Sequence, residues 1–166
     1  SYKKDLVDLY VNRDQHSFST QVTDLDNIQN PSIHSLLSSK YHEAQMHRLN
    51  IHAEIPDPVI HNYLTDLDLA VVLGHLMDNA IDGARKASEG FISLAYFDEE
   101  DCQSFIIEST IAEEQVPLSM MSTQLSHPEG GIGVNAVQDI LERYPNTSFS
   151  VRSQNHKMMQ ILEMRP

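Results

Sequence analysis

The spacing of apolar residues divides the chain into a helical beginning and a body in which helices and strands alternate. Between residues 2 and 16, four apolar or aromatic side chains recur at spacings of three and four, namely Tyr2, Leu6, Leu9 and Tyr10. This spacing predicts an amphipathic helix that needs a partner surface. A second short helical stretch is expected around Leu25, and Asn30-Pro31 should end it.

The strongest helical pattern of the body covers residues 66–86. Its apolar positions fall near one side, and they are Leu69, Leu73, Leu76, Ala80 and Ala84. An Asp or Thr is available as its N-cap. An earlier helix is expected from about residue 33 to 48, capped by Ser32, with a buried face of Ile33, Leu36, Leu37, Tyr41, Ala44 and Met46.

Strands are predicted where apolar residues alternate with polar ones or form short runs between turns. They cover residues 51–55, 91–97, 104–108, 147–153 and 158–164. The acidic turn 98–101 should close one hairpin and residues 154–156 another. Residues 110–129 are expected to form a long loop, and residues 134–143 a further helix.

These elements predict an α+β fold, a two-layer sandwich in which helices cover one face of a mixed sheet. We expect residues 1–30 to form a helical lead and residues 31–166 the α/β body. A chain of 166 residues with 40% hydrophobic content can bury one good core, and its length argues against two large domains.

Composition narrows the partners and the compartment. The net charge of −13 would repel a polyanion, so nucleic acid is not expected to bind. The single Cys102 fits a reducing, cytoplasmic compartment, and no apolar run reaches the roughly 20 residues that span a bilayer. Because the chain opens at Ser1 without a methionine, we interpret it as a segment of a longer protein that could carry membrane spans upstream.

Four polar residues of the long predicted helix, His75, Asn79, Asp82 and Lys86, are separated by four, three and four positions and therefore share one stripe. The amide oxygen of Asn79 would suit Mg²⁺, which prefers hard oxygen ligands. The alternative is that the stripe is simply the solvated face of an amphipathic helix.

A glycine-rich turn leads directly into the predicted helix at 134–143. Gly130, Gly131 and Gly133 allow the backbone to approach an anion closely, and the free amides of a helix N-terminus can face a phosphate. Alone, a short glycine run before a helix is a weak signal. Its position after the polar helix, a hairpin and a long loop is much more specific.

With this polar helix and this glycine turn, the sequence resembles the GHKL ATPase superfamily, which includes histidine kinases. Leu76–Asp82 matches the superfamily's N-box, and Gly131–Val134 matches its second glycine box. More narrowly, the chain resembles peptide-pheromone receptor kinases of the accessory-gene-regulator and competence type. That narrower likeness rests on Leu36–Lys40, Ala44-Gln45, Ile51, Ile55-Pro56 and Leu69–Gly74.

The resemblance implies a Bergerat-type sandwich that binds ATP and Mg²⁺ in a sensor histidine kinase of two-component, quorum-sensing signalling. Asn79 would hold Mg²⁺, Gly130, Gly131 and Gly133 would approach the phosphates, and His75 and Asp82 would be the catalytic groups. The partners implied are a second copy in a homodimer, a response regulator, and an upstream dimerisation helix and sensor region that carries the phosphorylated histidine. The predicted helix at 2–16 would be the end of the dimerisation hairpin.

Two departures from the family pattern leave a second function open. Ser109 stands where the first glycine box usually has an Asp that reads the adenine amino group, and a hydroxyl is a shorter, less directional acceptor. No Lys or Arg occurs between Lys86 and Arg143, although phosphoryl transfer normally uses basic side chains with metal ions. The alternative is therefore a degenerate ATPase-like module for interaction or dimerisation. An ATPase of the topoisomerase or chaperone branch is disfavoured, because His75 stands in place of the catalytic Glu.

Overall fold

The computed structural model describes residues 24–115 and 133–166, with side chains in the second stretch from residue 137 onward. The predicted helix at 2–16 and most of the predicted loop at 110–129 lie outside the described residues. The elements follow in the order η2 (Asp24–Asn27), α2 (Pro31–Met46), β1 (Asn50–Glu54), α3 (Asp66–Lys86), β2 (Phe91–Glu99), β3 (Cys102–Thr110), α5 (Gly133–Glu142), β4 (Thr147–Gln154) and β5 (Lys157–Met164).

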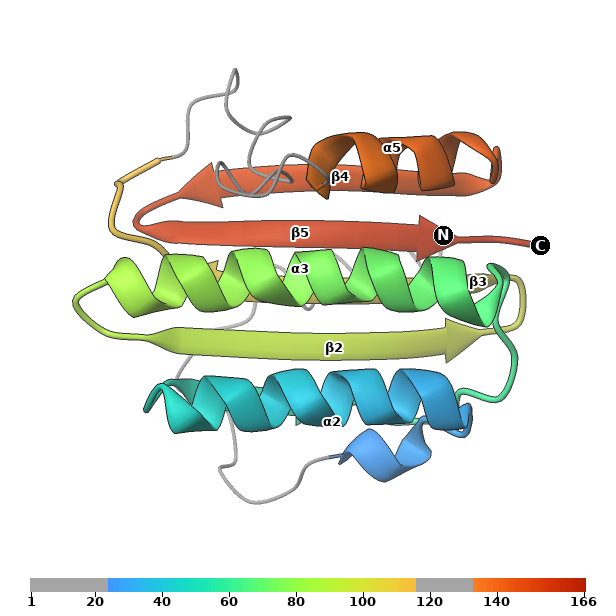
Figure 1. Cartoon of the computed structure of the whole chain (residues 1–166), viewed down its shortest axis with the longest axis horizontal. Helices are drawn as coiled ribbons and strands as arrows, with labels where there is room; N and C mark the ends of the chain where they lie inside the picture. The colour runs from blue at the N-terminus through green and yellow to red at the C-terminus, as the bar shows by residue number, and fades with distance from the viewer. Residues whose placement is uncertain (1–23, 116–132) are drawn as a thin grey trace.

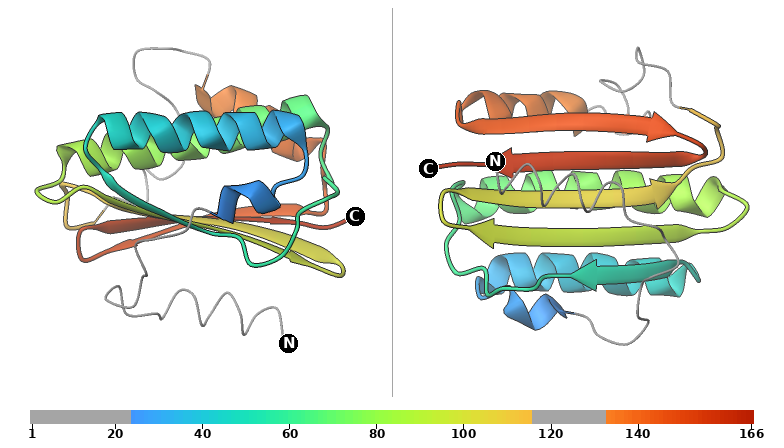
Figure 2. Two further views of the ribbon diagram at one scale, coloured as in Figure 1. Left: turned by 90° about the horizontal axis from the view of Figure 1, so that it is seen from below. Right: turned by 180° about the vertical axis from the view of Figure 1, so that it is seen from behind.

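The strands form one mixed sheet in the order β1-β2-β3-β5-β4. β1 pairs with β2 in parallel, while the other neighbours are antiparallel. The parallel pair needs a long crossover, which α3 supplies between β1 and β2. α2, α3 and α5 all lie on one face of the sheet (Figure 1, Figure 2). The predicted α+β sandwich with a mixed sheet is therefore confirmed.

α3 has the predicted bounds and lies across the middle of the sheet (Figure 1). Thr65 is its N-cap and accepts a hydrogen bond from the backbone nitrogen of Asp68. Acidic residues in the first turn and basic residues in the last complement the helix dipole. Apart from Asp68, its buried residues are all apolar, and their burial fixes the rotation of the helix about its axis.

α2 begins two residues earlier than predicted, and Ser32 is not its cap. The side chain of Asn30 accepts hydrogen bonds from the backbone nitrogens of Ser32 and Ile33, at 3.0 and 3.2 Å. Pro31 opens the helix, where its missing N–H is harmless. The Asn30-Pro31 pair thus starts this helix in addition to ending the stretch before it. The prediction that Met46 is buried is also wrong, because it is 70% exposed at the end of the helix.

The residues before α2 also contact the body. The short stretch expected around Leu25 is the 3₁₀ helix η2. Asn27 donates its side-chain amide to the backbone oxygen of Ile55 at 2.6 Å, and the carboxylate of Asp24 accepts from the nitrogen of Ile55 at 3.1 Å. Leu25 and Ile28 are buried in the core. The boundary at residues 30 and 31 stays a prediction.

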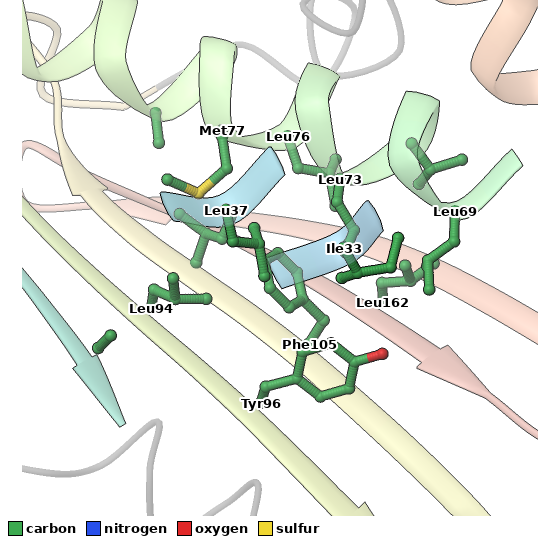
Figure 3. Close-up of a cluster of buried hydrophobic side chains, with 14 of the residues drawn as sticks. Ile33, Leu37, Leu69, Leu73, Leu76, Met77, Leu94, Tyr96, Phe105 and Leu162 are labelled. Carbon is green, nitrogen blue, oxygen red and sulfur yellow. The ribbon is translucent and has the colours of Figure 1, made fainter. Parts of the chain in front are cut away.

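The main core fills the space between the helices and the sheet (Figure 3). Tyr96 and Phe105 meet edge to face, with ring centroids 5.3 Å apart. The aliphatic side chains labelled around them come from α2, α3 and the strands, and include Ile33, Leu37, Leu69, Leu73, Leu94 and Leu162. A smaller cluster of Ala95, Ile106, Met159 and Ile161 lies on the other face of the sheet. Among the described helices, none is long and apolar enough to cross a bilayer.

Candidate functional site

The polar stripe predicted on α3 lies at the border between the core and solvent. His75, Asn79 and Asp82 are half-buried, whereas Lys86 near the end of the helix is exposed. A face that is simply solvated would be exposed along its whole length. The burial of the first three side chains therefore favours a site between the helix and a neighbouring element.

Asn79 contacts a buried glutamine of the sheet. Nδ2 of Asn79 donates a hydrogen bond to Oε1 of Gln160 at 3.3 Å. Nε2 of Gln160 in turn donates to the backbone oxygen of Leu76 at 3.0 Å. Gln160 lies on β5 and is 1% exposed, so these bonds satisfy an amide that would otherwise be costly to bury. The contact joins β5 to the segment of α3 that carries the predicted metal ligand.

Ser109 lies near the end of β3, close to the last turns of α3. Its hydroxyl is buried and has no hydrogen-bond partner among the described residues. Gly83 allows the end of β3 to approach α3 closely, since a Cβ there would lie 3.0 Å from Cγ2 of Ile111 and 3.3 Å from the backbone oxygen of Thr110, with Oγ of Ser109 at 3.8 Å. An unsatisfied buried hydroxyl costs about 1–3 kcal/mol, so this oxygen retains an unused capacity to bond a ligand.

Ser109 and Gln160 belong to neighbouring strands and to the same face of the sheet. Ser109 pairs with Met158 across the β3–β5 ladder, and Gln160 is two residues farther along β5. Residues two apart on a strand point to the same side. The structure thus brings Asn79, Gly83 and Ser109 together at one region of the α3–sheet contact.

α5 runs in the opposite direction to α3 (Figure 1) and is anchored to its first turn. Nη2 of Arg143 donates to Oδ1 of Asp68 at 3.0 Å, and the Tyr144 hydroxyl donates to Oδ2 of Asp68 at 2.5 Å. A helix rises about 1.5 Å per residue. The length of chain from Arg143 back to Gly133 therefore matches the length from Asp68 forward to the N-box. The N-terminus of α5 therefore lies along the middle of α3 (Figure 1).

The predicted glycine turn is only partly described. Gly133 is the first residue of α5. Gly130 and Gly131 lie outside the described residues. The backbone amides at the start of an α-helix have no partners within the helix and suit an anion. The first turn of α5 has this property along the middle of α3.

The anchor at Asp68 is a charged cluster in which the carboxylate is buried and the Arg143 side chain is exposed. The hydrogen bond from Tyr144 has the largest effect on Asp68 and, together with Arg143, lowers the pKa of its carboxyl against the opposing effect of burial. The same Tyr144 hydroxyl accepts a bond from the backbone nitrogen of Thr65 at 3.3 Å. The cluster links the cap of α3 to the residues that follow α5.

A second ion pair fixes α3 against α2. Nζ of Lys40 lies 2.5 Å from Oδ1 of Asp78 and 3.3 Å from Oε2 of Glu43. Burial alone would lower the pKa of Lys40, but the hydrogen bond and charge of Asp78, aided by Glu43, outweigh it and raise that pKa. Asp78 immediately precedes Asn79, so this pair restrains the helix beside the candidate metal ligand.

The arrangement suits a phosphate-bearing ligand whose metal takes few ligands from the protein. Mg²⁺ is usually held by one or two protein oxygens together with substrate phosphates and water. Nδ2 is the end of the Asn79 amide that bonds Gln160, so Oδ1 is the end turned away from that bond. Over the described ranges, no group of three or more His, Cys, Asp or Glu could hold a metal by itself. The donors fit a nucleotide-bound Mg²⁺ better than a metal enclosed by the protein.

Sequence patterns missed the residues that support the site. Gln160 occupies an inward position of an apolar strand, and a polar residue there is a signal of a buried partner. Asp68 occupies the third position after the Thr65 N-cap, where an acidic residue is expected for local reasons. Its bonds to Arg143 and Tyr144 join segments far apart in the chain, which spacing does not reveal.

Comparison with known families and structures gives a consistent result. The family model described as "GHKL domain" matches residues 64–165. No curated protein matches the sequence. The match begins just before α3 and ends after β5, so it includes Asn79, Ser109 and Gln160.

Several solved structures share the fold. A nucleotide-free catalytic domain of histidine kinase ThkA has 14% identity, covers 82% of this chain and 91% of its own, and has a TM-score of 0.66. The histidine kinase AdeS of Acinetobacter baumannii has 16% identity, with 98% and 76% covered and a TM-score of 0.60. ThkA in complex with the response regulator protein TrrA has 14% identity, with 82% and 40% covered and a TM-score of 0.62. At these identities the likeness shows the fold.

Proposed function

This chain belongs to the GHKL domain family, and on that premise we propose that it is the ATP-binding catalytic domain of a sensor histidine kinase. The domain would bind Mg²⁺ and ATP and phosphorylate a histidine located upstream of residue 1. The observation that carries the proposal is the buried Ser109 hydroxyl, which has no described partner and lies beside Gly83 near the N-box. A buried hydroxyl left unsatisfied is understandable as a ligand contact.

We assign the predicted site residues as follows. Oδ1 of Asn79 holds Mg²⁺, and Ser109 accepts or donates a hydrogen bond at the adenine edge. Backbone amides at Gly130, Gly131 and Gly133 would bind the phosphates. When bound, Mg·ATP supplies the phosphoryl group and neutralises part of its charge.

His75 and Asp82 are proposed as the catalytic groups of the site. Both are half-buried on the stripe that carries Asn79, one turn before it and just under one turn after it. A histidine can exchange protons near neutral pH, which suits a reaction that transfers a phosphoryl group to an imidazole. Asp82 would act through the water shell of the metal or through hydrogen bonds to the nucleotide.

The finer biological setting is also proposed. The likeness to peptide-pheromone receptor kinases supports a role in quorum sensing, downstream of a membrane-bound sensor region, with the catalytic domain in the cytoplasm and the whole protein a homodimer. A response regulator is the expected acceptor of the phosphoryl group. In support, the structurally similar kinase ThkA has been solved with the response regulator TrrA.

One observation favours a second function, a degenerate ATPase-like module that presents a surface without kinase activity. The segment from residue 87 to 142 contains no Lys or Arg, so it offers ATP no permanent cation. Such a module would fold and associate in the same way whether or not Asn79 is intact.

Calorimetric titration of ATP with and without Mg²⁺ separates the two functions. We expect the wild-type chain to bind ATP more tightly with Mg²⁺, and Asn79→Ala to lose this Mg²⁺-dependent part of the affinity because the metal loses its protein oxygen. Asn62→Ala is the control, since its amide contacts Asp66 at the opposite end of α3. No binding by the wild-type chain at millimolar nucleotide would reject the kinase function and favour the degenerate module.

A further inference from the structure

We propose that Gln160 is a positioning residue that selects which atom of the Asn79 amide faces the metal. The inference rests on the proposed function and extends it to a residue of β5 that contacts Asn79 and would not touch the nucleotide. An amide has a donor end and an acceptor end of almost the same shape, so only its hydrogen-bond partners decide its orientation. The two bonds of Gln160 determine that orientation in three steps.

The first step is the orientation of Gln160 itself. Its side chain meets the backbone oxygen of Leu76 at 3.0 Å, and a carbonyl oxygen can only accept. The atom of Gln160 that faces Leu76 must therefore be Nε2. The Leu76 oxygen has two lone pairs, so it can accept this bond in addition to its helical one.

The second step is the orientation of Asn79. With Nε2 committed to Leu76, the other end of the Gln160 amide is the acceptor Oε1, which lies 3.3 Å from Asn79. Asn79 must present its donor Nδ2 to this oxygen, because two amide oxygens in contact would repel each other. Oδ1 of Asn79 consequently points away from β5.

The third step is the consequence for the metal. Mg²⁺ binds amide oxygens and does not bind the NH₂ group, which has no lone pair available. A freely rotating amide would turn its NH₂ group toward the metal part of the time. Metal binding would then have to restrict the rotation of the Asn79 side chain. Gln160 is 1% exposed, so its own two bonds form in a site from which water is excluded. The oxygen of Asn79 is thus preorganised before ligand arrives.

The test compares Gln160→Leu with a matched control, Gln103→Leu. Gln103 is also a buried glutamine of the sheet, but it bonds the backbone oxygen of His61 and the Tyr96 hydroxyl, away from Asn79. We expect both variants to be less stable than the wild type. Only Gln160→Leu should weaken nucleotide binding in Mg²⁺, by about tenfold, as is typical when the partner of a metal ligand is removed. ATP binding in EDTA should stay within about twofold for both.

A second measurement needs no nucleotide. In the wild-type chain, NMR should show side-chain amide protons of Asn79 and Gln160 that exchange slowly with solvent, and Gln160→Leu should remove the protection at Asn79. Rapid exchange at Asn79 in the wild type would overturn the proposed orientation. This readout reports the contact directly, whereas a loss of general stability would affect amides throughout the domain.

A double variant separates orientation from packing. In an Asn79→Asp background both terminal atoms are oxygens, so adding Gln160→Leu should cause no further loss of Mg²⁺-dependent affinity. A loss equal to that in the Asn79 background would overturn the inference. If the ATP affinity of the wild type depends on Mg²⁺ and that of Gln160→Leu depends on it to the same extent, the inference fails while the proposed kinase function stands. If the wild type binds no ATP under either condition, the proposed function fails first.

Discussion

At the scale of single residues, the site is made of buried polar groups that an ordinary core would lack. Ser109 has a buried hydroxyl without a described partner, and Gln160 brings an amide into an otherwise apolar strand. The amide is satisfied by Leu76 and Asn79, whereas the hydroxyl is not. The two residues therefore have opposite effects on the stability of the ligand-free domain.

Ser109→Ala should stabilise the ligand-free domain and weaken ATP binding. Removal of an unsatisfied buried hydroxyl relieves a desolvation cost, so we expect the free energy of unfolding to rise by about 1 kcal/mol. Urea denaturation measures this change, and calorimetry measures the loss of affinity. Ser104→Ala is the control, because that hydroxyl contacts the Cys102 sulfur at 3.9 Å and its removal should bring no gain. A clear loss of stability in Ser109→Ala would show that the hydroxyl has a structural partner.

The sequence was informative about the residues that we propose meet the ligand, and much less so about the residues that support them. Asn79 and Ser109 stand at recognisable places in motifs, and the structure puts both at the same region of the α3–sheet contact. Gln160 belongs to no motif, because its role depends on β5 lying next to α3 after folding. Residues that act through tertiary contacts leave no local spacing to detect.

At the scale of elements, the antiparallel pair α3 and α5 determines where the first turn of α5 lies. The cluster of Asp68, Arg143 and Tyr144 fixes the far end of α5, and the helix length then sets the level of its first turn. The bounds of α3 were predictable, since its apolar face and Thr65 cap agree. The start of α2 was not, because Asn30-Pro31 is compatible with both the end of one segment and the beginning of the next.

Tyr144→Phe should destabilise the domain in a manner that depends on pH. The phenol donates to Asp68 and lowers the pKa of that carboxyl, so the folded state favours the ionised form. Its stabilising effect is complete above the pKa of an unfolded Asp, about 3.9, and is lost as the pH falls through the lower pKa of the folded state. We expect a loss of about 2 kcal/mol at neutral pH, as for a hydrogen bond to a charged group.

Urea unfolding of both proteins at neutral pH and at a pH below the folded pKa of Asp68 checks this expectation. Tyr41→Phe is the control, because that hydroxyl donates to the backbone oxygen of Ile51 at 3.1 Å and no carboxylate is involved. Its effect should change little with pH. A Tyr144→Phe effect of equal size at both pH values would mean that packing or the bond from the Thr65 nitrogen, rather than the Asp68 contact, accounts for it.

At the scale of the whole molecule, the dominant feature is charge. Twenty-four acidic residues against eleven basic ones give a net charge of −13, and the mutual repulsion of these charges opposes the compact state. The ion pairs of Lys40 and Arg143 act against this repulsion locally. They involve few of the carboxylates, so repulsion should dominate the response to salt.

Raising NaCl from about 0.05 to about 0.5 M should therefore raise the melting temperature, because higher salt shortens the distance over which exposed charges repel each other. A gain of about 1 kcal/mol corresponds to about 2–4 °C in a domain of this size. Differential scanning calorimetry at constant neutral pH measures it. A lower melting temperature in high salt would mean that attractive pairs outweigh the net repulsion.

The two edges of the sheet have a consequence for how the domain behaves when tethered. In the homodimer proposed for the parent protein, two copies would share an effective concentration on the order of millimolar. β1 is only five residues long, and the outward positions of β4 carry polar groups, Ser148, Ser150, Arg152 and Gln154. Short edges and charged or polar edge strands resist pairing with another sheet. Each domain can thus stay at a high local concentration beside the second copy without its sheet pairing with the other sheet, and it can still move independently.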